Sequence, residues 1–286
     1  MANKTGVLTS LRDFDAIRND PNVTWTREPG SNVDVLTSGD IPLAICHLDV
    51  IQPFTYFGES VAQFITFEDL AAVALAAHHL NTGDSRLVPD LEGLPSRCNV
   101  RFTIESGDTQ LTPSVGVDHV LNITSRQPGV ERLPCAFIGA YRSAVSIATS
   151  IFTGLRKYPQ ISAGSTSADL EDKFQYPLFG RTIPSDSGNA VPIIQFLHEV
   201  LGITHLAVLN VNDAYGNSFV QGLRVAAEKH APAMNIHQVS IDEQIASIRT
   251  ALNSIKATQY QVIFTILFSP ETHDAVLNMA YEIGIA

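Results

Sequence analysis

The spacing of apolar residues along the chain switches repeatedly between the period of a strand and the period of a helix. Val100, Phe102 and Ile104 alternate as in a strand, whereas residues 69–80 carry their larger apolar side chains on one helical face. Strands are predicted at residues 43–50, 100–104, 135–138, 160–163, 205–210, 236–241 and 260–268, and helices at 69–80, 113–121, 144–155, 187–201, 218–230, 245–255 and from 270. Because parallel neighbours need crossover connections, this alternation predicts an α/β fold with parallel sheets flanked by helices.

Two series of strands and helices lie on either side of an irregular segment at residues 165–184. Before the first series, residues 1–40 are polar and aperiodic, and Pro21, Pro29 and Gly30 interrupt them. We therefore expect residues 1–40 to be a leader or a poorly ordered extension outside the fold. The last predicted helix reaches the end of the sequence with no strand after it, so the second series is expected to be incomplete.

The most apolar stretch, residues 133–155, is long enough to be considered as a membrane span. However, Arg142 near its middle would cost about 2.5–3.5 kcal/mol in a bilayer, and Pro134, Gly139 and Gly154 interrupt the stretch. We interpret it as a strand, a turn and a helix. In that helix an apolar stripe recurs at amphipathic spacing, formed by Ala144, Ile147, Ala148, Ile151 and Leu155.

Composition narrows the classes of protein that the chain can belong to. With 286 residues, of which 45% are apolar and 16% charged, it can bury a core in each of two domains. Its net charge of -11 and its lack of a Lys/Arg cluster oppose binding to DNA or RNA. We expect a folded protein with no nucleic-acid partner.

The three cysteines, Cys46, Cys98 and Cys135, have no metal-ligand spacing, and their odd number permits at most one internal disulfide. Cys98 with Cys135 is one candidate pair, and small buried hydrophobic side chains are an equal alternative. No metal site and no cofactor are predicted.

Signals for export are weak. No apolar signal-peptide core lies within residues 1–40, so this sequence carries no export address. Three Asn-x-Ser/Thr triplets, at Asn3, Asn22 and Asn122, are compatible with glycosylation outside the cell.

The sequence lacks the common catalytic signatures. It contains no G-x-S-x-G elbow, Walker loop, dinucleotide glycine fingerprint or H-E-x-x-H helix, and its nine histidines show no ligand spacing. We therefore do not expect an enzyme.

Candidate binding groups lie at turns that follow predicted strands. In open parallel sheets, ligands bind beyond the carboxyl ends of strands, where helix N-termini present unpaired N–H groups. The turn at residues 139–143 places Arg142 and Ser143 at such a helix start, which suits an anionic group such as an α-carboxylate. Alternatively, Ser143 only caps the helix. Asp186, before the first helix of the second series, would pair with an ammonium or cap that helix.

Two further turns carry groups of the same kind. Residues 164–167, Gly-Ser-Thr-Ser, follow the strand predicted at 160–163 and offer three hydroxyls, or they form an ordinary polar loop. Tyr215 would form an aromatic wall for an ammonium through cation–π attraction, or it packs as an ordinary turn tyrosine.

Ordered blocks of sequence carry a resemblance that bears on these alternatives. Between Gly139 and Gly216 the chain resembles the ligand-binding region shared by class C G-protein-coupled receptors, natriuretic-peptide receptors and bacterial branched-chain amino-acid binding proteins. The blocks are residues 143–148 (SAVSIA), 159–162 (PQIS), 165–170 (STSADL), 172–173 (DK), 176–179 (YPLF), 181–186 (RTIPSD) and 213–216 (DAYG). Weaker similarity at residues 43–109 and 219–286 extends the resemblance to roughly four-fifths of the chain.

The resemblance implies roles for five of the candidate residues. In amino-acid-sensing members of class C, the residues that match Ser143 and Thr166 hold the ligand α-carboxylate. Those that match Asp186 and Tyr215, with the backbone at Gly164, surround the α-ammonium.

In the first turn, Tyr141 and Arg142 replace the small residues that some receptors place there. A bulky arginine would fill the site or recruit a second anion, so the resemblance does not imply glutamate as the ligand.

The resemblance also implies a two-lobed clamshell of the type I periplasmic-binding-protein-like fold, with lobe 1 at residues 41–184 and an incomplete lobe 2 at residues 185–286. It implies the extracellular ligand-binding module of a membrane receptor, which senses an amino acid or similar small molecule by cleft closure. Attachment to the membrane would come from segments outside this sequence, and homodimers through lobe 1 are usual among the receptor relatives. A soluble amino-acid-binding protein that serves a transporter is the alternative.

Overall fold

The computed structural model of the chain describes residues 23–27, 32–38, 41–56, 59–62, 64–128, 131–242 and 245–285. The chain divides into two compact units. Unit 1 comprises Met1–Ser165 and Lys173–Thr182, and unit 2 comprises Thr166–Asp172 and Ile183–Ala286. The chain therefore passes between the units after Ser165, after Asp172 and after Thr182, two residues before the boundary that the sequence predicts.

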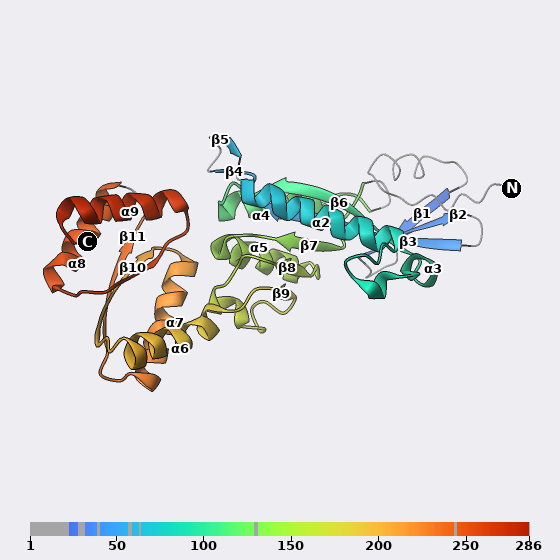
Figure 1. Cartoon of the computed structure of the whole chain (residues 1–286). Coiled ribbons are helices and arrows are strands. Elements are labelled where there is room, and N and C mark those ends of the chain that lie inside the picture. The colour runs from blue at the N-terminus through green and yellow to red at the C-terminus, as the bar shows by residue number, and fades with distance from the viewer. Residues whose placement is uncertain are drawn as a thin grey trace. The chain divides into compact units, whose positions relative to one another are not determined.

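Unit 1 is built on a seven-stranded sheet around one long strand, β3 (Ile41–Gln52) (Figure 1). Along one edge, β3 pairs in parallel with β6 (Val100–Asp108). Along the other edge it pairs first with antiparallel β2 (Asp34–Ser38) and then with parallel β7 (Ala136–Gly139). The sheet continues through β1 (Val23–Arg27) beyond β2, and through β8 (Gln160–Ser162) and β9 (Phe179–Arg181) beyond β7, while β4 (Thr55–Tyr56) and β5 (Glu59–Ala62) form a separate hairpin.

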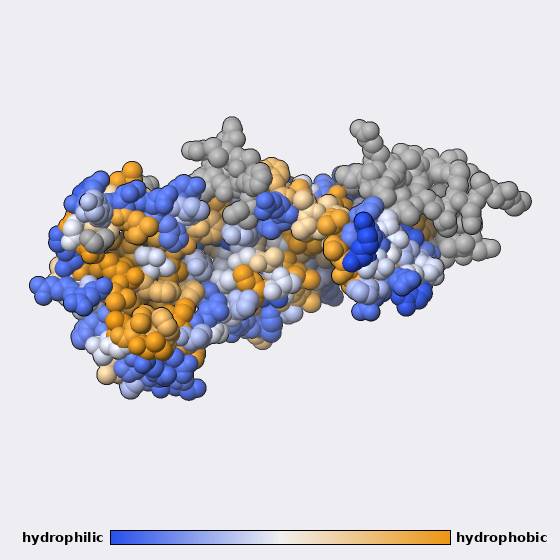
Figure 2. All heavy atoms as spheres, in the orientation of Figure 1, coloured by the Kyte–Doolittle hydropathy of each residue, from blue (hydrophilic) through white to orange (hydrophobic). Residues whose placement is uncertain are grey.

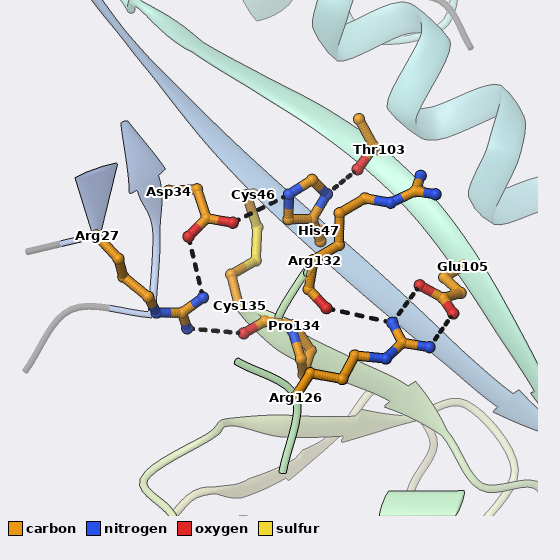
Figure 3. A network of polar contacts seen from close by, with 10 residues as sticks. All are labelled: Arg27, Asp34, Cys46, His47, Thr103, Glu105, Arg126, Arg132, Pro134 and Cys135. Atoms are coloured by element: carbon orange, nitrogen blue, oxygen red, sulfur yellow. Dashed lines mark hydrogen bonds and ion pairs between the residues drawn. A yellow bond between two sulfur atoms is a disulfide. The ribbon is translucent and has the colours of Figure 1, made fainter. Parts of the chain in front are cut away.

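The N-terminal strands correct one expectation. Residues 1–40 were expected to lie outside the fold, but β1 and β2 form an antiparallel hairpin on the edge of β3. Asp34 on β2 is 1% exposed, and its carboxylate accepts a hydrogen bond from Arg27 at 3.2 Å and lies 3.2 Å from His47 Nε2. Arg27 also donates to the Pro134 carbonyl at 3.2 Å (Figure 3), so buried charge fixes the hairpin to the sheet. Residues 1–22 lie outside the described part of the chain.

Unit 1 contains the helices α2 (Phe64–Thr82), α3 (Leu94–Arg97), α4 (Pro113–Thr124) and α5 (Ser143–Leu155), with a short 3₁₀ turn, η1 (Pro89–Leu91). The stretch 133–155 is a strand, a turn and a helix, as the sequence predicts. Across the described residues, no helix combines the length and the apolarity that a membrane crossing needs.

Helix α5 buries its polar side chains and exposes the C-terminal part of its apolar stripe. Thr149 and Thr153 are buried and contact the side chain of Gln160 on β8, with hydrogen bonds of 2.9 and 3.2 Å. Ile151 and Leu155 are 41% and 75% exposed. Amphipathic spacing alone would place the apolar stripe against the core. That inference is wrong here, because buried hydrogen bonds satisfy the polar face.

Unit 2 is a three-stranded parallel sheet, β11 (Asn235–Ile241), β10 (His205–Val211) and β12 (Ile263–Ile266), with helices on both faces. One core cluster joins β10 to α6 (Asp186–Gln195), its π turn η3 (Phe196–Val200) and α7 (Ala214–His230). The other joins the sheet to α8 (Ile245–Thr258) and α9 (Pro270–Ile283). The fold class is therefore α/β with mostly parallel sheets flanked by helices, as predicted from the alternating pattern.

One disulfide links Cys46 on β3 to Cys135, immediately before β7 (Figure 3). The candidate pair Cys98 with Cys135 is wrong, because Cys98 is a free, exposed cysteine after α3. The correct pair could not be read from the sequence, since it depends on β3 and β7 being neighbours in the sheet.

Removal of this disulfide should destabilise unit 1. The bond spans 89 residues, and a Cys46→Ala/Cys135→Ala variant is expected to lose about 2–5 kcal/mol of unfolding free energy, measured by urea denaturation. Cys98→Ala is the control and should unfold like the unmodified chain. Three reactive thiols in the unfolded, non-reduced protein, instead of one, would contradict the assignment.

Candidate functional site

The turn from β7 into α5 is fixed by close backbone packing. Gly139 has a φ of 124°, and a Cβ at this position would lie 2.0 Å from the Ile51 carbonyl oxygen, so only glycine fits. Arg142 is the N-cap residue of α5 and makes no side-chain capping hydrogen bond. Ser143 is the first residue of the helix and is 3% exposed. The capping alternative for Ser143 is therefore wrong.

Buried hydroxyls tie this turn to the next one along the sheet edge. The Ala140 carbonyl accepts hydrogen bonds from Ser146, Ser162 and Ser165 at 3.1, 2.7 and 3.0 Å. Ser162 Oγ in turn accepts from the backbone N–H groups of Gly164 and Ser165 at 3.1 and 2.9 Å. These hydrogen bonds therefore link the turns after β7 and β8 to each other.

The four residues 164–167 have different environments and hydrogen bonds. Ser165 is fully buried in the hydroxyl cluster, and Ser167 is fully buried and accepts a hydrogen bond from Asp169 N–H at the start of η2 (Ala168–Glu171). Thr166 is half-buried and is the remaining hydroxyl of the three. A Cβ on Gly164 would lie 2.7 Å from the Tyr141 ring and 2.9 Å from its carbonyl oxygen, so these backbones are in contact.

The ends of β3 and β6 complete the same edge of the sheet. Gln52 ends β3 and its carbonyl accepts from Thr109 N–H at 3.0 Å, while Gln52 Nε2 donates to Asp69 Oδ2 at 3.3 Å. Burial raises the pKa of Tyr141 above its ordinary value, and the negative charge of Asp69 raises it further. Asp69 therefore lies near Tyr141, although the sequence pattern does not predict a role for Asp69. The sequence feature that could have pointed to Asp69 is its position, because it is an acid at the start of the helix that follows the strand predicted at residues 43–50.

In unit 2, Asp186 and Tyr215 lie in the first turns of α6 and α7, and Thr166 lies just before η2. The backbone N–H of Asp186 donates to the Thr166 carbonyl at 3.0 Å, which joins these two residues directly. Asp186 is 1% exposed and is the first residue of α6, whereas the cap is Ser185, whose hydroxyl accepts from Ser187 N–H. The capping alternative for Asp186 is therefore wrong. Tyr215 is half-buried in the first turn of α7. Its ring packs edge-on against the ring of Phe219, and the two ring centroids are 6.2 Å apart.

The predicted site residues thus form two groups. The structure places Arg142, Ser143 and Gly164 at one edge of unit 1. Thr166, Asp186 and Tyr215 belong to unit 2. Their roles toward a ligand stay predictions. Within the described ranges, no group of three or more His, Cys, Asp or Glu side chains could hold a metal ion.

A groove of about 350 Å³ lies within unit 2 and contains none of these six residues. Val191 of α6, Gly222 of α7 and Asp169 of η2 are among the residues that line it. Figure 2 shows apolar side chains gathered over α6 and α7, and Phe196, Val200, Leu201 and Val225 are exposed there.

Comparison with known proteins identifies the family. Residues 68–286 match the family described as receptor family ligand binding region, so the chain belongs to that family. It is 32% identical to metabotropic glutamate receptor 4 of Rattus norvegicus over 122 residues, which cover 43% of this chain and 12% of that protein. It is 26% identical to taste receptor type 1 member 3 of Felis catus over 224 residues, 74% of this chain and 25% of that protein. Metabotropic glutamate receptor 8 of Homo sapiens is 37% identical over 84 residues, 29% of this chain and 9% of that protein.

These relatives bear out the resemblance to class C receptors, and the chain is a receptor ligand-binding module. It spans a quarter or less of the length of the three relatives.

Replacing Gly164 with alanine should disturb the coupled turns. The added methyl group would press on Tyr141, so Gly164→Ala is expected to lower the free energy of unfolding by about 1–3 kcal/mol, measured by urea denaturation. Gly188→Ala in α6 is the control, because nothing lies within 4 Å of its added Cβ, and it should be neutral or slightly stabilising. Equal stability of Gly164→Ala and the unmodified chain would contradict the close packing.

Proposed function

We propose that this chain is the extracellular ligand-binding module of a membrane receptor and that it senses an amino acid or a similar small molecule by closure of its two units. The proposal is supported by the family match over residues 68–286 and by relatives that are named as metabotropic glutamate and taste receptors. A soluble protein that serves a transporter would have the same fold, but each of the three relatives described above is named as a receptor.

The observation that carries the proposal is the division of one predicted ligand-binding set between two compact units. Ser143 and Gly164 lie in unit 1, whereas Thr166, Asp186 and Tyr215 lie in unit 2. A ligand that uses both groups binds fully only when the units close on it. Binding energy would then shift the population toward the closed state.

The side chains of Ser143, Asp186 and Tyr215 suit the two charged ends of an amino acid. Ser143 offers a hydroxyl at the N-terminus of α5, where the helix dipole favours a carboxylate. Asp186 is a buried acid at the start of α6, and Tyr215 an aromatic ring at the start of α7, and these are groups that favour an ammonium. A ligand that moves the equilibrium from 1:99 to 99:1 needs about 5.5 kcal/mol of preference for the closed state.

We assign binding and no catalysis to the chain, and we place it on the outer side of the cell membrane. Asn122, one of the three glycosylation triplets, is exposed on α4, which fits this location. Asn3 and Asn22 lie outside the described residues.

A homodimer through unit 1 is part of the proposal. The exposed stripe of α5, with Ile151 at 41% and Leu155 at 75%, is the surface that supports it, because exposed apolar residues at helical spacing suit a packed helix interface. The partner would be a second copy of this chain.

Loss of either predicted anchor should abolish ligand binding. In a thermal-shift screen of amino acids, γ-aminobutyrate and small anions, at least one ligand at a hundred times its Kd should stabilise the chain by about 2.7 kcal/mol. We expect no stabilisation of Ser143→Ala or Asp186→Ala, because each variant loses a group that contacts one end of the ligand.

Matched controls are available at exposed positions. Ser254→Ala on α8 and Asp90→Ala in η1 make the same chemical changes far along the chain from either group, and both variants should keep the ligand effect. Stabilisation that survives in both Ser143→Ala and Asp186→Ala would refute the assignment of the site.

Charge on the α5 stripe should separate the dimer. Leu155→Glu is expected to shift the mass measured by light scattering from dimer to monomer, because a carboxylate cannot be buried in an apolar interface without a large cost. Leu277→Glu on α9 of unit 2 is the control, since Leu277 is also exposed, at 64%. A unit 1 dimer is refuted if the unmodified chain is monomeric at high concentration, or if Leu155→Glu stays dimeric.

A further inference from the structure

Gln52 ends β3, the strand that lies beside β7 in the unit 1 sheet. Its neighbour Ile51 pairs with Gly139, so Gln52 is level with the start of the turn that leads to Ser143. On the other side, Thr109 N–H donates to the Gln52 carbonyl at 3.0 Å, which places the end of β6 beside it. Gln52 therefore shares the carboxyl edge of the sheet with Ser143.

Two buried polar atoms at this edge lack hydrogen-bond partners in the described part of the chain. They are Gln52 Oε1 and Thr109 Oγ1, on side chains of residues only 3% and 1% exposed. A buried acceptor that is left unpaired destabilises the folded chain. Both atoms lie where the ends of adjacent strands meet, which is where ligands of open sheets bind.

The acid beside Gln52 has unused acceptor capacity as well. Asp69 Oδ2 accepts the hydrogen bond from Gln52 Nε2 at 3.3 Å, and among the described residues no Lys or Arg forms an ion pair with Asp69. Burial raises the pKa of Asp69, the negative charge of the neighbouring Glu68 raises it further, and no positive charge in the described ranges lowers it.

Asp108, the other acid at this edge, is already used by the fold. Its carboxylate accepts hydrogen bonds from Phe54 N–H at 2.9 Å, Thr55 N–H at 3.3 Å and the Thr55 hydroxyl at 2.6 Å. These bonds hold the loop after β3. Asp69 is therefore the acid at this edge that is left for a ligand.

We infer that Asp69 and Gln52 form a subsite for a positively charged group, so that the ligand is an α-amino acid whose side chain ends in an ammonium or guanidinium. The inference rests on the proposed function and specifies the ligand class. An ammonium has three donors and no acceptor, which matches the carboxylate of Asp69 and the unpaired Oε1 of Gln52. A side chain ending in a carboxylate would meet repulsion from Asp69 and Glu68.

The ligand comparison needs no variant. Isothermal titration calorimetry on the 286-residue chain would compare L-lysine, L-arginine, L-norleucine and L-glutamate. Norleucine has the apolar side chain of lysine without the ammonium. L-lysine is expected to bind at least about tenfold more tightly than L-norleucine or L-glutamate, because a hydrogen bond to a charged group contributes about 1.5–3 kcal/mol.

A matched pair of variants tests whether Asp69 binds the charged end of the ligand. Asp69→Asn should bring the affinity for L-lysine down to that for L-norleucine, while Glu68→Gln, the same change on the exposed neighbour, should keep the preference. The thermal unfolding curve of each variant would confirm that it is folded.

The outcomes separate the two proposals. If amino acids bind but L-norleucine or L-glutamate binds as tightly as L-lysine, or if folded Asp69→Asn keeps the preference, the subsite is refuted and the proposed function survives. If no amino acid binds the folded unmodified chain, the proposed function is refuted and the subsite with it.

Discussion

The candidate site depends on one buried carbonyl. Ala140 O accepts hydrogen bonds from three serine hydroxyls, and two of these, Ser162 and Ser165, come from the end of β8 and the turn after it. Because the three donors are fully buried, water does not compete for them. The turn that carries Ser143 and the turn that carries Gly164 therefore keep a fixed geometry without any ligand. A site that is preorganised in this way spends less binding energy on ordering itself.

The same edge shows how a fold divides its polar groups between structure and recognition. Ser165 and Asp108 are used by the local backbone, whereas Gln52 has an unpaired acceptor and Asp69 has no positive partner among the described residues. Residue type alone does not distinguish the two sets. The distinction depends on which hydrogen bonds each side chain already makes.

Periodicity predicted most of the elements because the larger strands and helices have one buried side. The strand at residues 205–210 and the helix from 270 coincide with β10 and α9 to within a residue or two. The apolar stripe on α5 gave a wrong prediction of which face of the helix is buried. Thr149 and Thr153 form buried hydrogen bonds with the side chain of Gln160, and a hydropathy pattern does not reveal such bonds. Strand β9 and the hairpin β1–β2 were missed because short strands on a sheet edge depend on their neighbours more than on their own sequence.

The candidate site was only partly accessible to sequence reasoning. Ser143 and Asp186 were selected by their places at predicted helix starts and then by the matching blocks, and their positions one residue after the cap could be learned only from the backbone. Asp69 and Gln52 lie 17 residues apart and meet through a single hydrogen bond, so no local motif marks them. The pairing of Cys46 with Cys135 likewise requires the strand order.

The hairpin β1–β2 has a practical consequence for shortened forms of this protein. It covers the first half of one edge of β3, from Ile41 to Ile45, which would otherwise offer unpaired N–H and C=O groups. Exposed strand edges recruit other strands and lead to aggregation. A recombinant fragment that begins at Ile41 would retain every proposed ligand contact and yet be at risk of precipitating, so fragments meant for crystallisation should start upstream of Val23.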